Sequence, residues 1–89
     1  MPRVEKEITI KSSQGLHARP AALFVQVVNK YNCEVVISKN GEKVNGKSIM
    51  GILTLGAEKG CTVVVEVEGD DAQQLLDELE ELLIKEVDE

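Results

Sequence analysis

The one histidine of the chain, His17, lies in the run GLHARPAA at residues 15–22, two positions before Arg19. Pro20 belongs in the first turn of a helix, because its ring is tolerated there and disrupts a helix further in. The free backbone N–H groups of that turn, those of Ala18 and Arg19 among them, are therefore available beside His17. They attract an anion, and the helix dipole adds positive potential. This combination suits a histidine that carries phosphate covalently.

The neighbours of His17 also set its chemistry. Positive potential at a helix start disfavours a protonated imidazole, so a neutral ring nitrogen is available as a nucleophile near neutral pH. After phosphate is attached, the same potential stabilises its negative charge, and Arg19 can make bidentate contacts to the phosphate oxygens. A structural or surface role is the ordinary alternative for a lone histidine, and the three converging features favour the reactive role.

No second constellation for chemistry is evident in the sequence. A general-base role for His17 lacks partners, because the chain shows no Ser-His-Asp or Cys-His arrangement and no P-loop. Cys33 and Cys61 have no C-x-x-C spacing and no histidine at metal spacing, so we expect no metal and no cofactor. Both begin apolar alternating segments and are interpreted as buried reduced thiols. Adjacent strands could still bring them together in a disulfide.

Length and charge limit the class of protein. A length of 89 residues predicts one domain, residues 1–89. The composition, with 43% hydrophobic and only 2% aromatic residues, predicts a small core of Val, Leu and Ile. A net charge of −6 disfavours direct nucleic-acid binding and favours partners with a basic face. No segment is apolar for long enough to cross a membrane, and the first residues do not form a signal peptide. We therefore expect a cytoplasmic protein without membrane insertion.

The first elements along the chain position this histidine. Apolar residues alternate with polar ones from Val4 to Ile10, except at Lys6, and predict a strand with a frayed start. Residues 12–15 are typical of a turn, and residues 18–29 predict a helix that is apolar on nearly every side. The histidine then lies where the turn gives way to the helix.

A hairpin and a short helix follow. Asn40 and Gly41 are the strongest short hairpin signal, because a type I′ turn needs positive φ at both positions. They separate a strand that begins at Cys33 from a short return strand over residues 43–45. The spacing of apolar residues then predicts a short helix over residues 48–56.

The last two elements complete the predicted fold. Residues 61–68 alternate valine with polar residues and predict a fourth strand. Residues 69–71 cap an amphipathic helix, and its acidic residues are interpreted as a solvated face: Asp77, Glu78, Glu80 and Glu81. The order β-α-β-β-α-β-α predicts an α+β open-faced β-sandwich with helices on one face of an antiparallel sheet. Odd-numbered strand positions would be buried. The residues left in water would be Glu34, Glu66, Glu68 and Lys11.

Two sequence blocks resemble a known family. Residues 15–21, GLHARPA, resemble the active-site motif of HPr, the histidine-containing phosphocarrier protein of the bacterial phosphoenolpyruvate:sugar phosphotransferase system. Residues 45–52, NGKSIMGI, resemble the regulatory region of HPr in low-GC Gram-positive bacteria. Both lie at the family's separation, and the resemblance covers essentially the whole chain. It implies a single HPr-like domain, a four-stranded antiparallel sheet covered by three helices.

The resemblance implies a phosphocarrier rather than a stand-alone enzyme. His17 would accept a phosphoryl group at Nδ1 from enzyme I, ultimately from phosphoenolpyruvate, and donate it to the enzyme IIA domain of a sugar permease. Arg19 would stabilise charge on the migrating group, whose loose transition state needs positioning and electrostatics. Gln14 is a departure, because relatives often carry a smaller polar residue there that is able to touch the histidine ring.

Ser48 is a candidate for a second phosphorylation. Serine is among the best helix N-caps whether or not it is modified. A phosphate there would lie at the favourable end of the helix dipole. The resemblance implies modification by an ATP-dependent HPr kinase/phosphorylase, which would lower transfer to His17 and create a corepressor for the catabolite control protein.

The short helix also suggests a contact surface, because two turns cannot bury all of its apolar residues in one direction. By resemblance, Ile49, Met50 and Leu53 form an apolar patch near His17 that enzyme I, enzyme IIA and regulators share. Positive charge from Arg19, Lys30 and Lys47 would surround it. The implied partner interface consists of Ala22, Lys47, Ile49, Met50 and Leu53.

Three classes of function remain open at this point. They are a sugar-system phosphocarrier, a regulatory paralogue of a nitrogen-related system and a non-catalytic binding module. The block around Ser48 favours the first class over the second, and retention of His17 argues against a purely serine-regulated relative. We expect a monomer.

Overall fold

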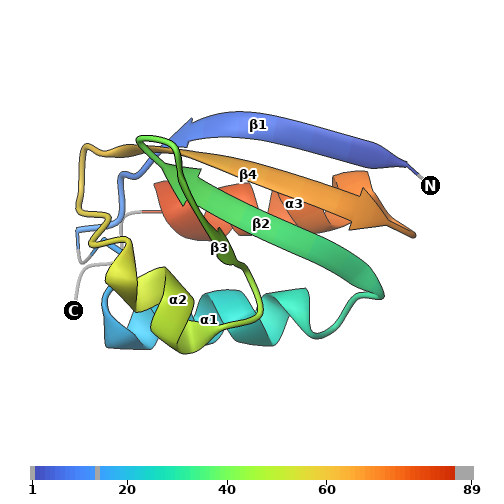
Figure 1. Ribbon diagram of the computed structural model, residues 1–89, viewed down its shortest axis with the longest axis horizontal. Coiled ribbons are helices and arrows are strands. Elements are labelled where there is room, and N and C mark those ends of the chain that lie inside the picture. Colours follow the sequence, from blue (N-terminus) through green and yellow to red (C-terminus); the bar gives the residue numbers. More distant parts are fainter. Residues whose placement is uncertain (1, 14, 86–89) are drawn as a thin grey trace.

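The computed structural model describes residues 2–13 and 15–85 of the chain. Its elements are β1 (Arg3–Thr9), α1 (Ala18–Val28), β2 (Cys33–Lys39), β3 (Glu42–Asn45), α2 (Ile49–Thr54), β4 (Thr62–Gly69) and α3 (Ala72–Ile84). The strands form one antiparallel sheet in the order β1-β4-β2-β3, and the helices gather on one side of it (Figure 1). The predicted α+β open-faced sandwich is confirmed.

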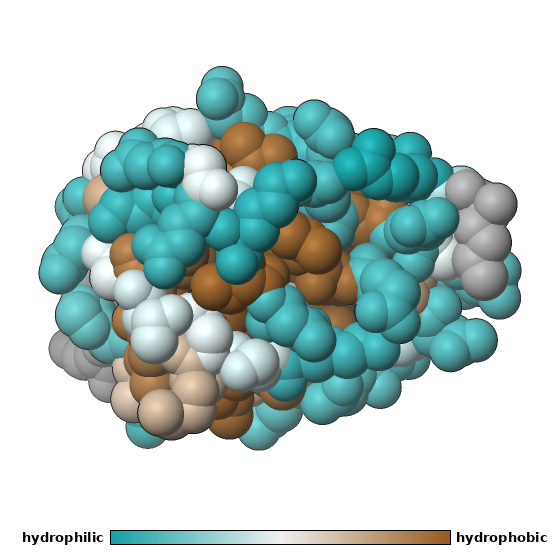
Figure 2. All heavy atoms as spheres, in the orientation of Figure 1, coloured by the Kyte–Doolittle hydropathy of each residue, from teal (hydrophilic) through white to brown (hydrophobic). Residues whose placement is uncertain are grey.

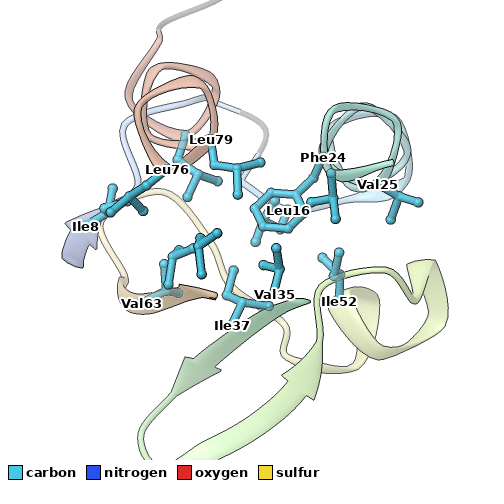
Figure 3. Close-up of a cluster of buried hydrophobic side chains, with 14 of the residues drawn as sticks. Ile8, Leu16, Phe24, Val25, Val35, Ile37, Ile52, Val63, Leu76 and Leu79 are labelled. Atoms are coloured by element: carbon cyan, nitrogen blue, oxygen red, sulfur yellow. The ribbon is translucent and has the colours of Figure 1, made fainter. Parts of the chain in front are cut away.

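The core lies between the sheet and the helices. Figure 3 shows Phe24 and Val25 of α1 and Leu76 and Leu79 of α3 pointing toward the valines and isoleucines of the sheet. Phe24 is fully buried and is the largest side chain in the core. Each such side chain contributes about 1.5–3 kcal/mol when it leaves water. Burial on this side of the sheet therefore holds the helices against the strands.

The buried strand positions differ from the prediction in β1. Odd-numbered residues such as Val35 and Val63 are buried in β2 and β4, but in β1 the buried residue is the even-numbered Ile8. The register explains this, because Ile8 lies directly opposite Val63 across the antiparallel ladder. Residues directly opposite each other share a face of the sheet. Buried and exposed residues therefore alternate within the strand as predicted. Whether the odd- or the even-numbered residues face the core depends on the register with the neighbouring strand.

Lys6 does not fray the first strand, contrary to the prediction. It pairs with Val65 inside the ladder between β1 and β4. Its ammonium Nζ donates a hydrogen bond to Glu80 Oε1 of α3 at 2.9 Å. The aliphatic stem of a lysine covers apolar surface while its charge stays in water. Lys6 thus substitutes for an apolar residue at the sheet edge.

The acidic face of α3 is only partly solvated. The carboxylate of Glu78 accepts hydrogen bonds from the Tyr31 hydroxyl and, at 3.1 Å, from Lys30 Nζ. The hydrogen bond from Tyr31, followed by that from Lys30, lowers the pKa of Glu78. Glu80 is paired with Lys6. Two of the predicted solvent-facing acids therefore tie α3 to its neighbours.

The uncovered face of the sheet is charged. Glu34 and Glu68 are exposed there as predicted. The side chain of Glu66, by contrast, is only 13% exposed, because it forms ion pairs with Arg3 and with Lys43 at 3.6 Å. Neighbouring cations on β1 and β3 therefore cover an acid that was expected to stand in water.

The two cysteines are free and far apart. Cys33 pairs with Gly69 at the end of β4, whereas Cys61 directly precedes the first residue of that strand. A strand of this length separates them by well over the reach of a disulfide. The Cys33 thiol is buried and donates to the Asp70 carbonyl at 2.9 Å, and burial raises the pKa of that thiol. Cys61 is half-buried, so the prediction of buried thiols holds for Cys33 alone.

Two predicted turns have different outcomes. Asn40 and Gly41 both have positive φ, 52° and 85°, which confirms the hairpin between β2 and β3. Asp71 precedes α3 as predicted, but its side chain makes no capping hydrogen bond. Its backbone is left-handed, whereas capping serines and aspartates normally have extended backbone.

Within the described ranges, no helix is long and apolar enough to cross a membrane.

Candidate functional site

His17 is the residue from which α1 begins. It is the N-cap, with extended backbone (φ −83°, ψ −167°), and its carbonyl accepts from Ala21 N at 2.8 Å. Its imidazole makes no capping hydrogen bond and is 61% exposed. Pro20 is the third helical residue, inside the first turn as predicted. The imidazole is therefore exposed at a helix end whose first N–H groups lack intrahelical acceptors.

The turn before His17 is fixed by a close backbone approach. Leu16 is buried, and its N–H donates to the carbonyl of Ala57 at 2.8 Å. Gly15 has φ +60°, and a Cβ atom there would lie 2.7 Å from the Ala57 oxygen and 2.9 Å from Glu58 Cα. Only glycine accommodates both the conformation and the contact. The loop after α2 thus holds the backbone beside the histidine.

Two further segments hold the strand that leads into this turn. Ile10 accepts from the N–H of Gly60 at 2.8 Å. The N–H groups of Lys11 and Ser12 both donate to the Leu83 carbonyl near the end of α3, at 3.0 and 3.1 Å. The approach to the histidine is therefore bound to the α2–β4 loop and to α3, which lie far away in the sequence.

The structure adds an acid that sequence reasoning missed. Glu58 Oε1 lies 3.6 Å from His17 Nε2, and the two side chains are 67% and 61% exposed. The two residues meet only because the α2–β4 loop folds against Gly15. No spacing or motif in the sequence indicates this pair.

The other predicted residues near the histidine have mixed outcomes. Ala18 and Arg19 are exposed at the first and second positions of α1, so both lie at the helix end where the phosphate was predicted. Gln14 lies outside the described residues. Lys30 lies just beyond the C-terminal end of α1, where its ammonium pairs with Glu78 of α3. Lys30 therefore does not belong to the positive surroundings of the predicted patch, because α3 engages its charge.

Ser48 is the N-cap of α2, as predicted. Its hydroxyl oxygen accepts a hydrogen bond from the N–H of Gly51 at 2.9 Å. At the other end of this six-residue helix, Lys39 Nζ donates to the carbonyls of Leu55 and Gly56, at 3.2 and 3.1 Å. Side chains therefore satisfy backbone groups at both ends of a helix that is too short to be stable alone.

An apolar patch is exposed on α2, and we call Ile49, Met50 and Leu53 the α2 patch. Their exposed fractions are 41%, 73% and 37%, whereas Ile52 is fully buried. Leu23 of α1, which the predicted interface omitted, is also 42% exposed. Figure 2 shows apolar surface among hydrophilic residues over the α2 region. The expectation that α2 cannot bury all its apolar residues is confirmed.

The other two residues of the predicted interface, Ala22 and Lys47, have different surroundings. Ala22 is half-buried in α1. Lys47 is exposed just before α2, and its Nζ lies 3.8 Å from Glu34 Oε2 at the start of β2. Contacts at this distance between exposed side chains hold them weakly. Lys47 therefore remains available to a partner that offers a better acceptor.

Comparison with known proteins decides the family. The family described as PTS HPr component phosphorylation site matches residues 4–85 of the chain. The chain belongs to the HPr family. Members of this family are phosphocarrier proteins rather than stand-alone enzymes, and the Gram-positive type is the one that it resembles.

Individual HPr relatives cover nearly the whole chain. HPr-like protein Crh of Halalkalibacterium halodurans is 46% identical over 83 residues, which are 93% of this chain and 99% of that protein. The crystal structure of phosphocarrier protein HPr from Bacillus anthracis str. Ames has a TM-score of 0.89 at 40% identity, covering 93% of this chain and 99% of that one.

A third relative is described as a dimer. The crystal structure of Crh, the catabolite repression protein of Bacillus subtilis, has a TM-score of 0.73 at 40% identity and covers 90% of this chain and 92% of that one. It is described as a dimer with a swapped domain. At least one HPr-family chain therefore forms a dimer, and the monomer expected here from the sequence stays a prediction.

Proposed function

We propose that this chain is a phosphocarrier of the phosphoenolpyruvate:sugar phosphotransferase system, working in the cytoplasm. His17 accepts a phosphoryl group from phosphorylated enzyme I and donates it to enzyme IIA domains of sugar permeases. The observation that carries the proposal is the 61% exposed imidazole at the first turn of α1. In this proposal, the N–H groups of Ala18 and Arg19 and the guanidinium of Arg19 stabilise the phosphate.

The α2 patch supports exchange with large partners. Clustered exposed apolar residues mark contact sites, and an unbranched methionine adapts to different partner surfaces. Met50 is the most exposed large apolar residue of the described chain, at 73%. We propose that enzyme I and enzyme IIA contact this patch in turn, together with Ala22 and Lys47.

The direct test is the intact mass of the protein after incubation with enzyme I and phosphoenolpyruvate. We expect one added phosphoryl group per chain, lost on mild acid treatment as phosphohistidine is, and no addition when enzyme I is left out. An enzyme I preparation that labels an established HPr but leaves this chain unmodified contradicts the proposal.

We further propose that Ser48 is a regulatory site, modified by HPr kinase/phosphorylase to give a corepressor for the catabolite control protein. Its hydroxyl is half-buried and caps α2 immediately before Ile49 and Met50 of the α2 patch. A phosphate there gains from the helix dipole, so α2 need not melt. It also places negative charge at the edge of the surface that enzyme I contacts, which disfavours transfer of a second phosphate to His17.

Capping and phosphorylation at Ser48 are separable. We expect Ser48→Ala to lose acid-stable phosphorylation by the kinase and also about 0.5–2 kcal/mol of stability, because Gly51 N–H loses its acceptor. Ser48→Asn is the matched control, since asparagine caps helices well but offers no hydroxyl. We expect it to unfold near the wild-type temperature and to remain unphosphorylated. Equal melting temperatures for the two variants would show that the cap contributes nothing.

A second candidate function is suggested by the relatives named Crh, one of them 46% identical to this chain. Such a protein would serve catabolite repression through Ser48 without carrying phosphate on histidine. The exposed His17 at the start of α1 favours the carrier. Labelling of Ser48 by the kinase, with no labelling of His17 by enzyme I, would establish the regulator instead.

A further inference from the structure

We infer that Glu58 is a positioning residue for phosphoryl transfer, which engages Nε2 of the His17 ring and leaves Nδ1 facing the phosphoryl group. The inference rests on the proposed carrier function and adds a residue to it. The starting observation is the distance of 3.6 Å between Glu58 Oε1 and His17 Nε2.

The backbone of Glu58 is held in place. The Ala57 carbonyl before it accepts from Leu16 N at 2.8 Å, and its own carbonyl accepts from Cys61 N at 2.9 Å. Its Cα lies within 2.9 Å of the position of a Cβ on Gly15, so the two loops are in direct contact. The carboxylate therefore extends toward the histidine from a fixed anchor, although both side chains reach into solvent.

The contact selects one nitrogen of the ring. When a carboxylate accepts a hydrogen bond from one ring nitrogen, it fixes the proton there and leaves the other nitrogen with its lone pair. Glu58 lies on the Nε2 side at 3.6 Å, slightly longer than a hydrogen bond, so a small rotation of either exposed side chain is needed to form that bond. A proton on Nε2 therefore leaves Nδ1 as the nucleophile. With 61% of the His17 side chain exposed, a donor protein can still reach the ring.

The same carboxylate stabilises charge that develops during transfer. The Nδ1 lone pair forms the new bond to phosphorus while the bond from phosphorus to the donor breaks, and that electron pair leaves with the donor. The proton on Nε2 stays on the ring throughout. The imidazole thereby gains positive charge beside a carboxylate, an arrangement in which an acid orients a histidine and stabilises its cationic form. Glu58 takes no part in bond making.

The test combines ring spectroscopy with transfer kinetics on the full chain. In wild type we expect the ¹⁵N shifts of His17 to show the proton predominantly on Nε2. In Glu58→Ala the two ¹⁵N shifts should move toward those of free imidazole, and transfer from enzyme I should slow roughly fivefold, the size expected for an exposed charged contact. Glu58→Gln retains an acceptor without the charge, so it should keep the ring shifts and recover only part of the rate.

Glu68→Ala is the control, because it removes an exposed carboxylate at the opposite end of β4. We expect it to change neither readout. Unchanged ring shifts in Glu58→Ala overturn the inference, and faster transfer in that variant shows instead that the carboxylate repels the incoming phosphoryl group. If enzyme I labels neither wild type nor variants, the carrier function fails, while the ring shifts still decide whether Glu58 holds the histidine.

Discussion

His17→Ala is expected to accept no phosphoryl group from enzyme I and phosphoenolpyruvate, with the acid-labile label falling to background. His17 is the one histidine in the sequence, so no second imidazole can replace it. The fold should be unaffected, because the ring is 61% exposed and makes no capping hydrogen bond at α1. Intact mass before and after acid treatment measures the label, and thermal unfolding measures the fold.

The control for this variant is the second phosphorylation site. His17→Ala should still be phosphorylated at Ser48 by the kinase, to an acid-stable product, because the Ser48 cap of α2 does not involve the histidine. A variant that loses both phosphorylations has lost its structure and is uninformative about the carrier. An acid-labile label that persists in a folded His17→Ala protein would place the phosphoryl group elsewhere and contradict the proposal.

The sequence predicts those features of the fold and site that depend on one residue or a short run of residues. Pro20 marks the first turn of α1, and Asn40 with Gly41 marks the hairpin, since each limits the backbone at its own position. Ser48 caps α2 because a short hydroxyl three residues before Gly51 reaches the free N–H. These features can be predicted without knowing how the helices and strands pack together.

Features that the sequence did not predict depend on contacts between distant segments. Glu58 reaches His17 only because its loop packs against Gly15, and no pattern in the chain specifies that contact. Lys6 seemed to break a strand, yet α3 supplies its acidic partner, Glu80. The face on which Ile8 lies followed from the register with β4, which alternation within one strand cannot determine. In each case, a partner element had to be placed first.

The same contacts connect the two candidate phosphorylation sites. Ser48 begins α2, Lys39 binds the carbonyls at its end, and the chain then passes directly into the loop that holds the backbone at Leu16. Glu58 lies in that loop. A change in how α2 is seated on the fold therefore acts on the surroundings of His17 as well as on the α2 patch.

That seating depends on one side chain, so Ile52→Ala is expected to have the largest effect on stability among the variants considered. Ile52 is the buried residue of α2 and is fully inaccessible to solvent. Figure 3 shows it pointing into the space between α1 and β2, near Val25 and Val35. Truncating a core isoleucine to alanine costs about 2–5 kcal/mol, a large share of the roughly 5–15 kcal/mol that holds a small domain folded.

The melting temperature should therefore fall by about 10 °C or more, at roughly 4–8 °C per kcal/mol for a domain of this size. Part of the lost stability should appear as faster hydrogen exchange of the α2 backbone amides, because so short a helix has little stability of its own. Leu53→Ala is the matched control, because Leu53 is 37% exposed one position along the same helix. It should melt close to wild type while weakening transfer from enzyme I through the α2 patch. If both variants lose the same stability, burial of Ile52 does not anchor α2, and the connection between Ser48 and His17 must be carried by the capping contacts of Ser48 and Lys39 instead.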